Sequence, residues 1–195
     1  MKRAGAFLFG FLVAFLVAAC SSGGTVAPDV QSAAEDDLLF GVRRDAAVDC
    51  QPEREGLPAG ALGAITCLPA NELVTRFTLV RWESEERLMD AYFAALGEHG
   101  VEQGSGDCVT ERAGESAWLP GDDGTGVGVT ARQGCFDDGT DMVVLVTLPP
   151  TVLAEVHGDA SQTEGVVQWS WLGSQDVPGS PTIWNEDGPI NFEKG

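Results

Sequence analysis

SEERLMDAYFAALGEHG, which runs from Ser84 to Gly100, is the strongest helix signal in the chain. Its apolar residues recur at three- and four-residue spacings, as they do along a helix with one apolar face. These residues are Leu88, Met89, Tyr92, Phe93 and Leu96. Ser84 can cap the first turn, and Gly100 suits the position just after a helix. The stretch therefore predicts an amphipathic helix over 84–98 that packs against a sheet.

Strand signals lie on both sides of this helix. Val74–Val80 is rich in β-branched and aromatic residues, and Val127, Val129 and Ala131 alternate with small or polar residues. Met142–Leu148 is a continuous apolar run, which is typical of a central strand covered on both faces. Weaker strand candidates are Ala61–Cys67, Val152–His157 and Val166–Leu172. One main helix and a mostly antiparallel sheet predict an α+β domain of two layers.

The first nineteen residues have the pattern of a secretory leader. Lys2 and Arg3 precede an uncharged stretch that is short for a bilayer span and ends in small residues. The small residues directly before Cys20 resemble the lipobox of bacterial lipoproteins. That resemblance implies cleavage after residue 19, a diacylglycerol on the Cys20 thiol, and an anchor on the outer face of a bacterial membrane, which two acyl chains hold stably. An ordinary signal peptide or a short uncleaved anchor are the alternatives.

Composition divides the remaining chain into three segments. Residues 20–43 are mostly small and acidic, which predicts a flexible tether after the lipidated cysteine. Residues 44–172 are long enough for one extracytoplasmic domain with a single core. Residues 173–195 contain three prolines among small polar residues and predict an irregular tail, although Trp184 and Phe192 could pack back on the domain.

The charge balance is strongly acidic. The chain has 30 Asp and Glu against 11 Lys and Arg, a net charge of −19. Loss of Lys2 and Arg3 with the leader would make it −21. Such a field repels phosphate backbones, so we exclude nucleic-acid binding.

Four cysteines remain once Cys20 carries lipid: Cys50, Cys67, Cys108 and Cys135. An even number suits an exported protein, in a compartment where disulfides persist. Three pairings are possible. Pairing in sequence order is favoured because it closes short loops around segments that look like neighbouring strands. Neither a C-x-x-C motif nor a histidine at ligand spacing accompanies them, so no zinc site is predicted.

Several short motifs together resemble a known extracytoplasmic domain. They are Thr66-Cys67-Leu68-Pro69, Trp82-Glu83-Ser84, Leu88-Met89-Asp90-Ala91-Tyr92, Gly106-Asp107-Cys108, Gly134-Cys135-Phe136 and Trp169-Ser170-Trp171. Their succession over 65–172 resembles the domain that follows the membrane span of some actinobacterial serine/threonine protein kinases and that also occurs in small lipoproteins. The resemblance implies a sensing or binding module without known catalysis.

No catalytic motif stands out. Ser116 lacks the second glycine of a nucleophile elbow and is predicted to lie in a turn. The two histidines, His99 and His157, lie near the ends of predicted elements, where a structural or solvated role is usual. Carboxyl groups are too numerous for the sequence to single out an acid–base pair.

Metal and cofactor sites are not predicted either. The segment Asp-Asp-Gly-Thr at 137–140 and the Gly-Asp-Asp-Gly at 121–124 predict turns. Asp137, Asp138 and Asp141 could converge on calcium, but the spacing of a calcium-binding loop is missing. A hydrated turn is therefore expected there.

Two tryptophans are the best sequence clue to a ligand. If 166–172 is a strand, Trp169 and Trp171 project to the same side and could form an apolar platform for a sugar or another planar partner. Packing of the rings in the core, against the helix or the tail, is the favoured interpretation. A helix would separate the two rings, because residues two apart do not share a helix face.

The sequence thus predicts a lipid-anchored, non-enzymatic binding or sensing module at the bacterial cell envelope. Its partner would be a small molecule, a cell-wall glycan or another envelope protein. Two alternatives remain: an envelope hydrolase with an unrecognised carboxylate site, and a structural accessory of a membrane complex.

Overall fold

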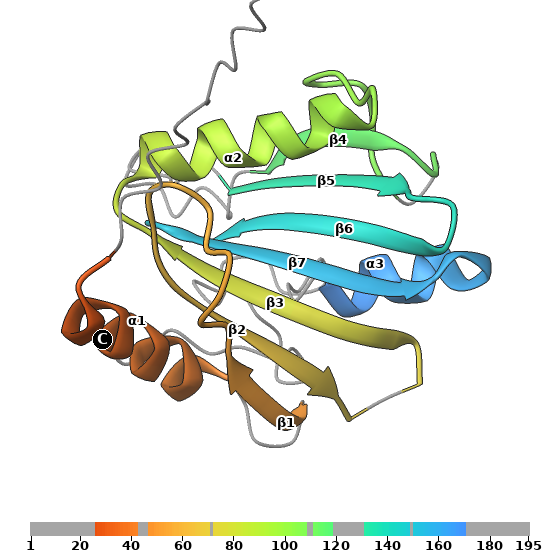
Figure 1. Cartoon of the computed structure of the whole chain (residues 1–195). Coiled ribbons are helices and arrows are strands. Elements are labelled where there is room, and N and C mark those ends of the chain that lie inside the picture. Colours follow the sequence, from red (N-terminus) through yellow and green to blue (C-terminus); the bar gives the residue numbers. More distant parts are fainter. Residues whose placement is uncertain are drawn as a thin grey trace, which may run out of the picture.

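The computed structural model describes residues 26–42, 47–70, 72–108, 111–118, 131–148 and 150–170. These residues form an antiparallel sheet of seven strands in the order β1-β2-β3-β7-β6-β5-β4, with helices packed against it (Figure 1). The strands are β1 (Ala47–Pro52), β2 (Ala61–Pro69), β3 (Val74–Trp82), β4 (Gly114–Trp118), β5 (Ala131–Asp137), β6 (Asp141–Leu148) and β7 (Val152–Asp159). The α-helices are α1 (Pro28–Gly41), α2 (Glu85–Glu98) and α3 (Thr163–Ser170), and a short 3₁₀ helix, η1 (Ala160–Gln162), precedes α3.

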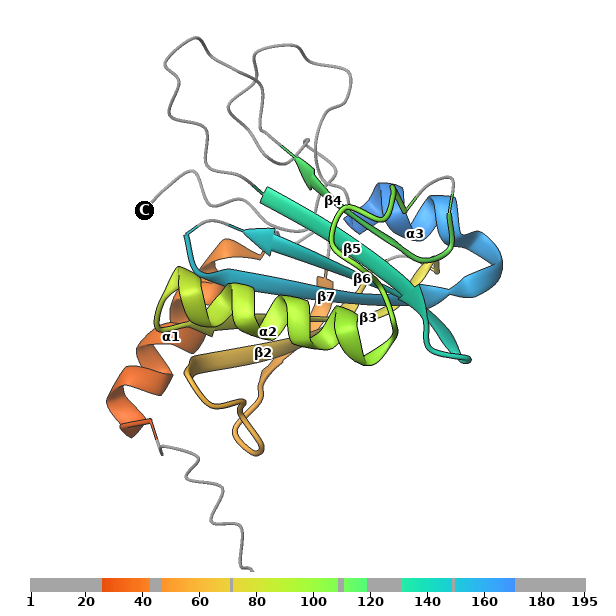
Figure 2. The same ribbon diagram turned by 90° about the horizontal axis from the view of Figure 1, so that it is seen from above.

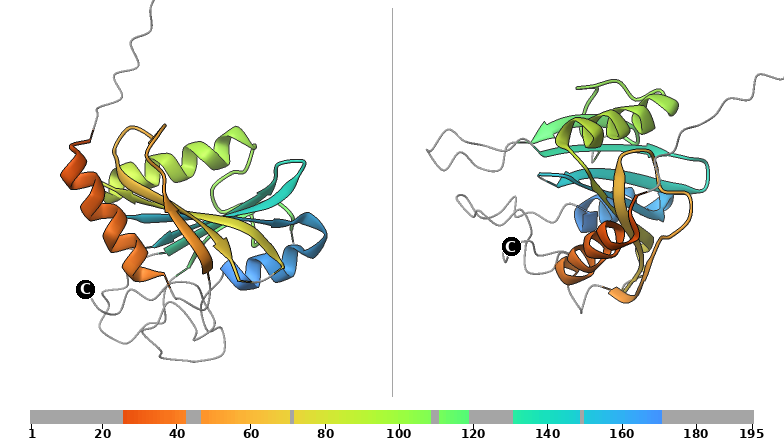
Figure 3. Two further views of the ribbon diagram at one scale, coloured as in Figure 1. Left: turned by 60° about the horizontal axis from the view of Figure 1, so that its bottom comes forward. Right: turned by 60° about the vertical axis from the view of Figure 1, so that its left-hand side comes forward.

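The helices cover both faces of the sheet. Leu38 of α1 and Val166 of α3 belong to one apolar core, and Leu88 and Tyr92 of α2 belong to a second core on the other face. Figure 2 shows α2 and α3 on opposite sides of the strands, and Figure 3 shows α1 alongside β2. The predicted α+β class is therefore confirmed, but the prediction of one main helix and two layers was incomplete.

Strand β6 lies beside the middle strand of the sheet, where both faces are covered. All residues from Met142 to Leu148 are buried. Val144 points into the core of α1 and α3, and Val143 points into the core of α2. This explains why the sequence shows a continuous apolar run instead of alternation.

Helix α2 begins and ends where the sequence predicts. The Ser84 hydroxyl accepts a hydrogen bond from the backbone N–H of Arg87 at 3.2 Å, and Gly100 has a φ of +70°. Gly134 of β5 lets this helix lie close to the sheet, because an added Cβ would come within 2.7 Å of the Leu96 methyl groups.

Helix α1 corrects the prediction of a flexible tether over 20–43, which is wrong for Pro28–Gly41. Composition alone suggested too little apolar surface for order. Leu38 nevertheless packs fully buried against the sheet, and a Cβ added at Gly63 of β2 would lie 3.1 Å from the Ala34 methyl group. The folded domain therefore includes this helix and begins before residue 44.

Helix α3 corrects a second prediction, the strand over 166–172. Val166, Val167 and Ser170 are its buried residues, which is helical spacing. Gly158 of β7 allows the close approach, since an added Cβ would lie 2.5 Å from a Val166 methyl group. The other predicted strands at 61–67, 74–80, 142–148 and 152–157 are confirmed. The short strands β1 and β4 were missed, and so was β5 beyond Arg132.

Both predicted disulfides are present, Cys50–Cys67 and Cys108–Cys135. Cys50 of β1 lies directly opposite Cys67 of β2, as expected for neighbouring strands. The second bond instead joins β5 to the loop after α2. The leader, Cys20, Val127, Val129, the turn at 121–124, Trp171 and the tail at 173–195 lie outside the described residues.

Candidate functional site

The sheet face under α2 has two halves of different character. Helix α2 covers one part of it, which includes the Trp82 end of β3 and the Leu153 end of β7 as well as β5 and β6. Across β1, β2, β3 and β7 the face carries a row of polar residues that face each other from strand to strand. The row consists of Gln51, Thr66, Thr78 and Glu155, with Arg76 and His157 as the adjacent pair. We call these six residues the polar half.

His157 is the centre of a charged cluster in the polar half. Its side chain is only 5% exposed. One ring nitrogen lies 2.5 Å from Glu155 Oε1, and the other lies 3.5 Å from Asp141 Oδ2. Arg76 Nη2 lies 3.2 Å from both ring nitrogens. The hydrogen bond from His157 lowers the pKa of Glu155, although burial acts in the opposite direction.

The hydroxyls of the polar half bond largely to one another. Thr66 and Thr78 are 3.0 Å apart, and Thr66 also donates to Glu53 Oε2 at 3.2 Å. These groups form a hydrogen-bonded network across the strands, in which His157 is buried and Glu155 is partly exposed.

The carboxyl groups with clear pKa shifts do not resemble a catalytic acid. Backbone hydrogen bonds lower the pKa of Asp138 and Asp159, and the His157 bond lowers that of Glu155. A general acid at neutral pH needs its pKa raised. The shifts therefore favour ionised, structural carboxylates at these three positions.

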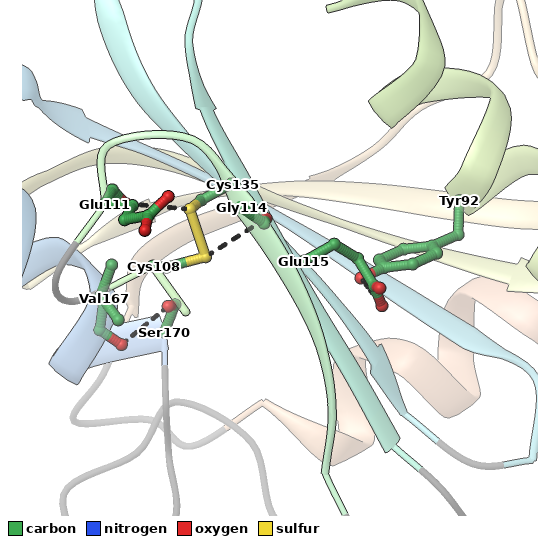
Figure 4. Close-up of a disulfide and its surroundings, with 8 residues drawn as sticks. All are labelled: Tyr92, Cys108, Glu111, Gly114, Glu115, Cys135, Val167 and Ser170. Atoms are coloured by element: carbon green, nitrogen blue, oxygen red, sulfur yellow. Dashed lines mark hydrogen bonds between the residues drawn. A yellow bond between two sulfur atoms is a disulfide. The ribbon is translucent and has the colours of Figure 1, made fainter. Parts of the chain in front are cut away.

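A second charged cluster lies buried under α2. Glu115 of β4 is 0% exposed, and its two oxygens accept four hydrogen bonds. Arg132 donates at 2.7 and 2.9 Å, Gly104 N at 2.7 Å, and the Tyr92 hydroxyl at 3.2 Å. Figure 4 shows Glu115 pointing towards Tyr92, away from the Cys108–Cys135 bond.

Burial and neighbouring charge together shift the pKa values of Tyr92 and Arg132, the two side chains that donate to Glu115. Burial, and then the negative charge of Glu115, raise the pKa of Tyr92 well above its ordinary value. The hydrogen bonds that Arg132 donates to Glu115 raise the pKa of Arg132, whose guanidinium also lies 5.1 Å from the centre of the Phe93 ring. Every acceptor position of Glu115 is used, so the cluster is a structural one.

A groove of about 530 Å³ lies between α1 and the ends of β2 and β3. Its apolar lining residues are Val30, Ala33, Ala34, Leu62 and Trp82. Its charged lining residues are Asp29, Asp37, Glu83 and Arg81. The Arg81 guanidinium donates a long hydrogen bond of 3.4 Å to Thr151 Oγ1. The groove is open to solvent over much of its extent, and its lining combines apolar surface with a few charged groups.

Most residues that the sequence offered as candidate site residues have structural roles in the fold. Ser116 lies in strand β4, so its prediction as a turn serine is wrong. His99 ends α2 and stacks on Phe136 with ring centres 3.7 Å apart. Asp137 and Asp138 accept backbone N–H bonds within the turn before β6, which confirms the turn. Within the described ranges, no group of three or more metal-binding side chains is assembled.

The predicted platform of Trp169 and Trp171 required a strand over 166–172, but residues 163–170 form helix α3. Trp169 lies on α3, half-buried, with its ring 5.4 Å from that of Phe77. It therefore packs on the core of α1 and α3. Trp171 lies outside the described residues.

The polar half and the groove were not predicted as sites. The alternation Arg76-x-Thr78 on β3 and Glu155-x-His157 on β7 was available as a signal of a wet sheet face. The groove had no such signal, because it depends on where α1 packs.

Comparisons with known proteins add no assignment, since no family model, curated protein or solved structure matches the chain. Among the described helices, none has the length and apolar character required to cross a bilayer.

Proposed function

We propose that this chain is a lipid-anchored binding module on the outer face of a bacterial membrane, and that the groove beside α1 is its ligand site. The observation that carries the proposal is the groove. Its volume falls within the range of small-molecule sites, and apolar side chains from a helix and two strands meet in it.

Two further features support an extracytoplasmic module. The lipobox-like sequence before Cys20 supplies an anchor, and two disulfides fit an oxidising compartment. Kinship with the extracytoplasmic domains of actinobacterial kinases belongs to the same proposal, because those domains are thought to sense or bind. The three carboxyl groups with a lowered pKa, Asp138, Glu155 and Asp159, do not resemble a general acid.

The anchor is tested by mass spectrometry of the N-terminal peptide from membrane fractions. We expect a diacylglycerol on Cys20 in the native chain and none in Cys20→Ala. A native chain that partitions entirely into the aqueous phase of a detergent phase separation would contradict the anchor.

The ligand site is tested by filling the groove. Ala33→Trp places a large ring on an exposed helix position that lines the groove, whereas Ser32→Trp alters the neighbouring position, which does not line it. We expect saturable quenching of tryptophan fluorescence by extracts of envelope small molecules in the native chain and in Ser32→Trp. If Ala33→Trp bound as well as the native chain, the ligand site would lie outside the groove.

A further inference from the structure

We infer that the groove beside α1 takes a membrane amphiphile with an ammonium group, its apolar chain lying along Val30, Leu62 and Trp82 and its cation near Asp29 and Asp37. This inference deepens the proposed function and rests on it for the membrane as the source of the ligand.

The apolar side chains that line the groove are the reason for inferring an apolar chain in the ligand. Val30 on α1 lines the groove and is 43% exposed, so its side chain is accessible to a ligand. Ala33 and Leu62 extend the apolar surface from α1 onto β2, and Trp82 of β3, which is 4% exposed and packs mainly in the α2 core, borders the groove. Covering this surface with a hydrocarbon chain removes apolar area from water, which is the main favourable term in such binding.

The cationic part follows from the charges around that surface. Asp29, Asp37 and Glu83 line the groove together with one cation, Arg81. Glu83 already pairs with Arg87 at 3.3 Å. Asp29 and Asp37 have no ion pair with another residue of the described ranges, so they are the carboxylates available to a ligand. The net charge of −19 adds to the attraction of a cation and opposes a fatty acid or a phosphate ester.

The membrane as the source follows from chain length. Seven residues separate Cys20 from Pro28, the first residue of α1. A fully extended chain spans at most roughly 3.5 Å per residue, so the start of α1 lies no more than roughly 28 Å from the lipidated cysteine. Asp29 and Val30 follow directly, which keeps the groove near the headgroup layer, where amphiphiles concentrate.

The test uses the mature chain from residue 20 with Cys20→Ser and both disulfides formed, because attached lipid would itself absorb the probe. Decyltrimethylammonium, kept below its micelle concentration, is titrated calorimetrically. We expect one saturable site. Tetramethylammonium, which lacks the chain, should bind at least about tenfold more weakly, and decyl sulfate, which reverses the charge, should not bind.

Two matched variants separate the groove from the general acidity of the protein. Asp37→Asn removes a lining carboxylate and should weaken binding by about two- to fivefold. Asp36→Asn removes the same charge from the adjacent exposed position, which does not line the groove, and should leave affinity unchanged. Ala33→Trp should abolish binding.

Equal loss in Asp36→Asn and Asp37→Asn, or equal binding of tetramethylammonium and decyltrimethylammonium, would overturn the inference. So would the absence of heat with every probe. These outcomes are distinct from failure of the proposed anchor, because lipidation of Cys20 is measured on the native chain and does not depend on ammonium binding.

Discussion

Two charged clusters on the same face of the sheet show how burial changes what similar residues do. Glu115 and Arg132 lie under α2, where four hydrogen bonds satisfy both carboxylate oxygens. His157, Glu155 and Arg76 lie in the polar half, where the Glu155 side chain is 44% exposed. A buried charge must be fully bonded, since water cannot reach it, whereas a solvated one need not be. Breaking the first cluster should therefore be costly, whereas loss of the partly exposed Glu155 carboxylate from the second should cost little.

The largest expected effect tests the buried cluster. Glu115→Ala leaves Arg132 buried without its partner, and we expect a loss of about 3–5 kcal/mol in the free energy of unfolding. Urea denaturation measures it. Adding Arg132→Met to Glu115→Ala should recover part of the loss, because the unpaired charge is then gone while the Gly104 N–H and the Tyr92 hydroxyl still lack their acceptor. A loss below about 1 kcal/mol in the single variant would show that Glu115 is not a buried, paired carboxylate.

The two disulfides lie towards opposite ends of the strand order, with Cys50–Cys67 on β1 and β2 and Cys135 of the other bond on β5. Replacing Cys108 and Cys135 by alanine opens the longer loop beside the buried cluster and should cost about 3.5 kcal/mol. The same change at Cys50 and Cys67, which brace β1 at the edge of the polar half, should cost about 3 kcal/mol. Unfolding in urea under oxidising conditions compares the two. A negligible cost for either pair would show that its loop is already constrained in the unfolded chain.

Gly134 tests how closely α2 seals its half of the face. Gly134→Ala would place a methyl group 2.7 Å from Leu96 and 3.0 Å from the Tyr92 hydroxyl. We expect a loss of about 1–3 kcal/mol. Gly97→Ala is the matched control, because an added Cβ there meets nothing within 4 Å. It should stabilise the helix by about 0.5–1 kcal/mol. If Gly134→Ala had the higher free energy of unfolding of the two variants, α2 would lie further from the sheet than the structure shows.

The smallest expected effect concerns the polar half. The pKa of Glu155 is lowered from 4.5 in the folded protein, chiefly by His157. Its contribution to stability is therefore complete above about pH 4.5 and is lost as the pH falls through the folded pKa. Glu155→Gln should cost less than about 1 kcal/mol at pH 7, because the group is partly solvated.

Urea unfolding of both proteins between pH 7 and pH 3 checks this dependence. The difference between native chain and Glu155→Gln should shrink towards low pH. A difference that stays constant over the whole range would show that the contact with His157 does not involve the ionised carboxylate.

Local signals were sufficient for much of the fold. Ser84 and Gly100 mark the ends of α2, the apolar run at 142–148 marks a covered strand, and loop length favours the observed disulfide pairing. In each case the physical cause acts over a few residues: a cap, a period or a short loop. The candidate sites were not predicted, because Arg76 and His157 are 81 residues apart and meet only through the pairing of β3 with β7.

The sequence by itself determined the α+β class, the main helix and the central strands and favoured the observed pairing of the cysteines, since these follow from hydrophobic period and chain connectivity. Only the tertiary structure decided that Pro28–Gly41 is a helix, that Trp169 belongs to the core, and that Glu115 is buried. Burial depends on which surfaces meet across the sheet. That is a property of packing between distant segments, which local composition does not contain.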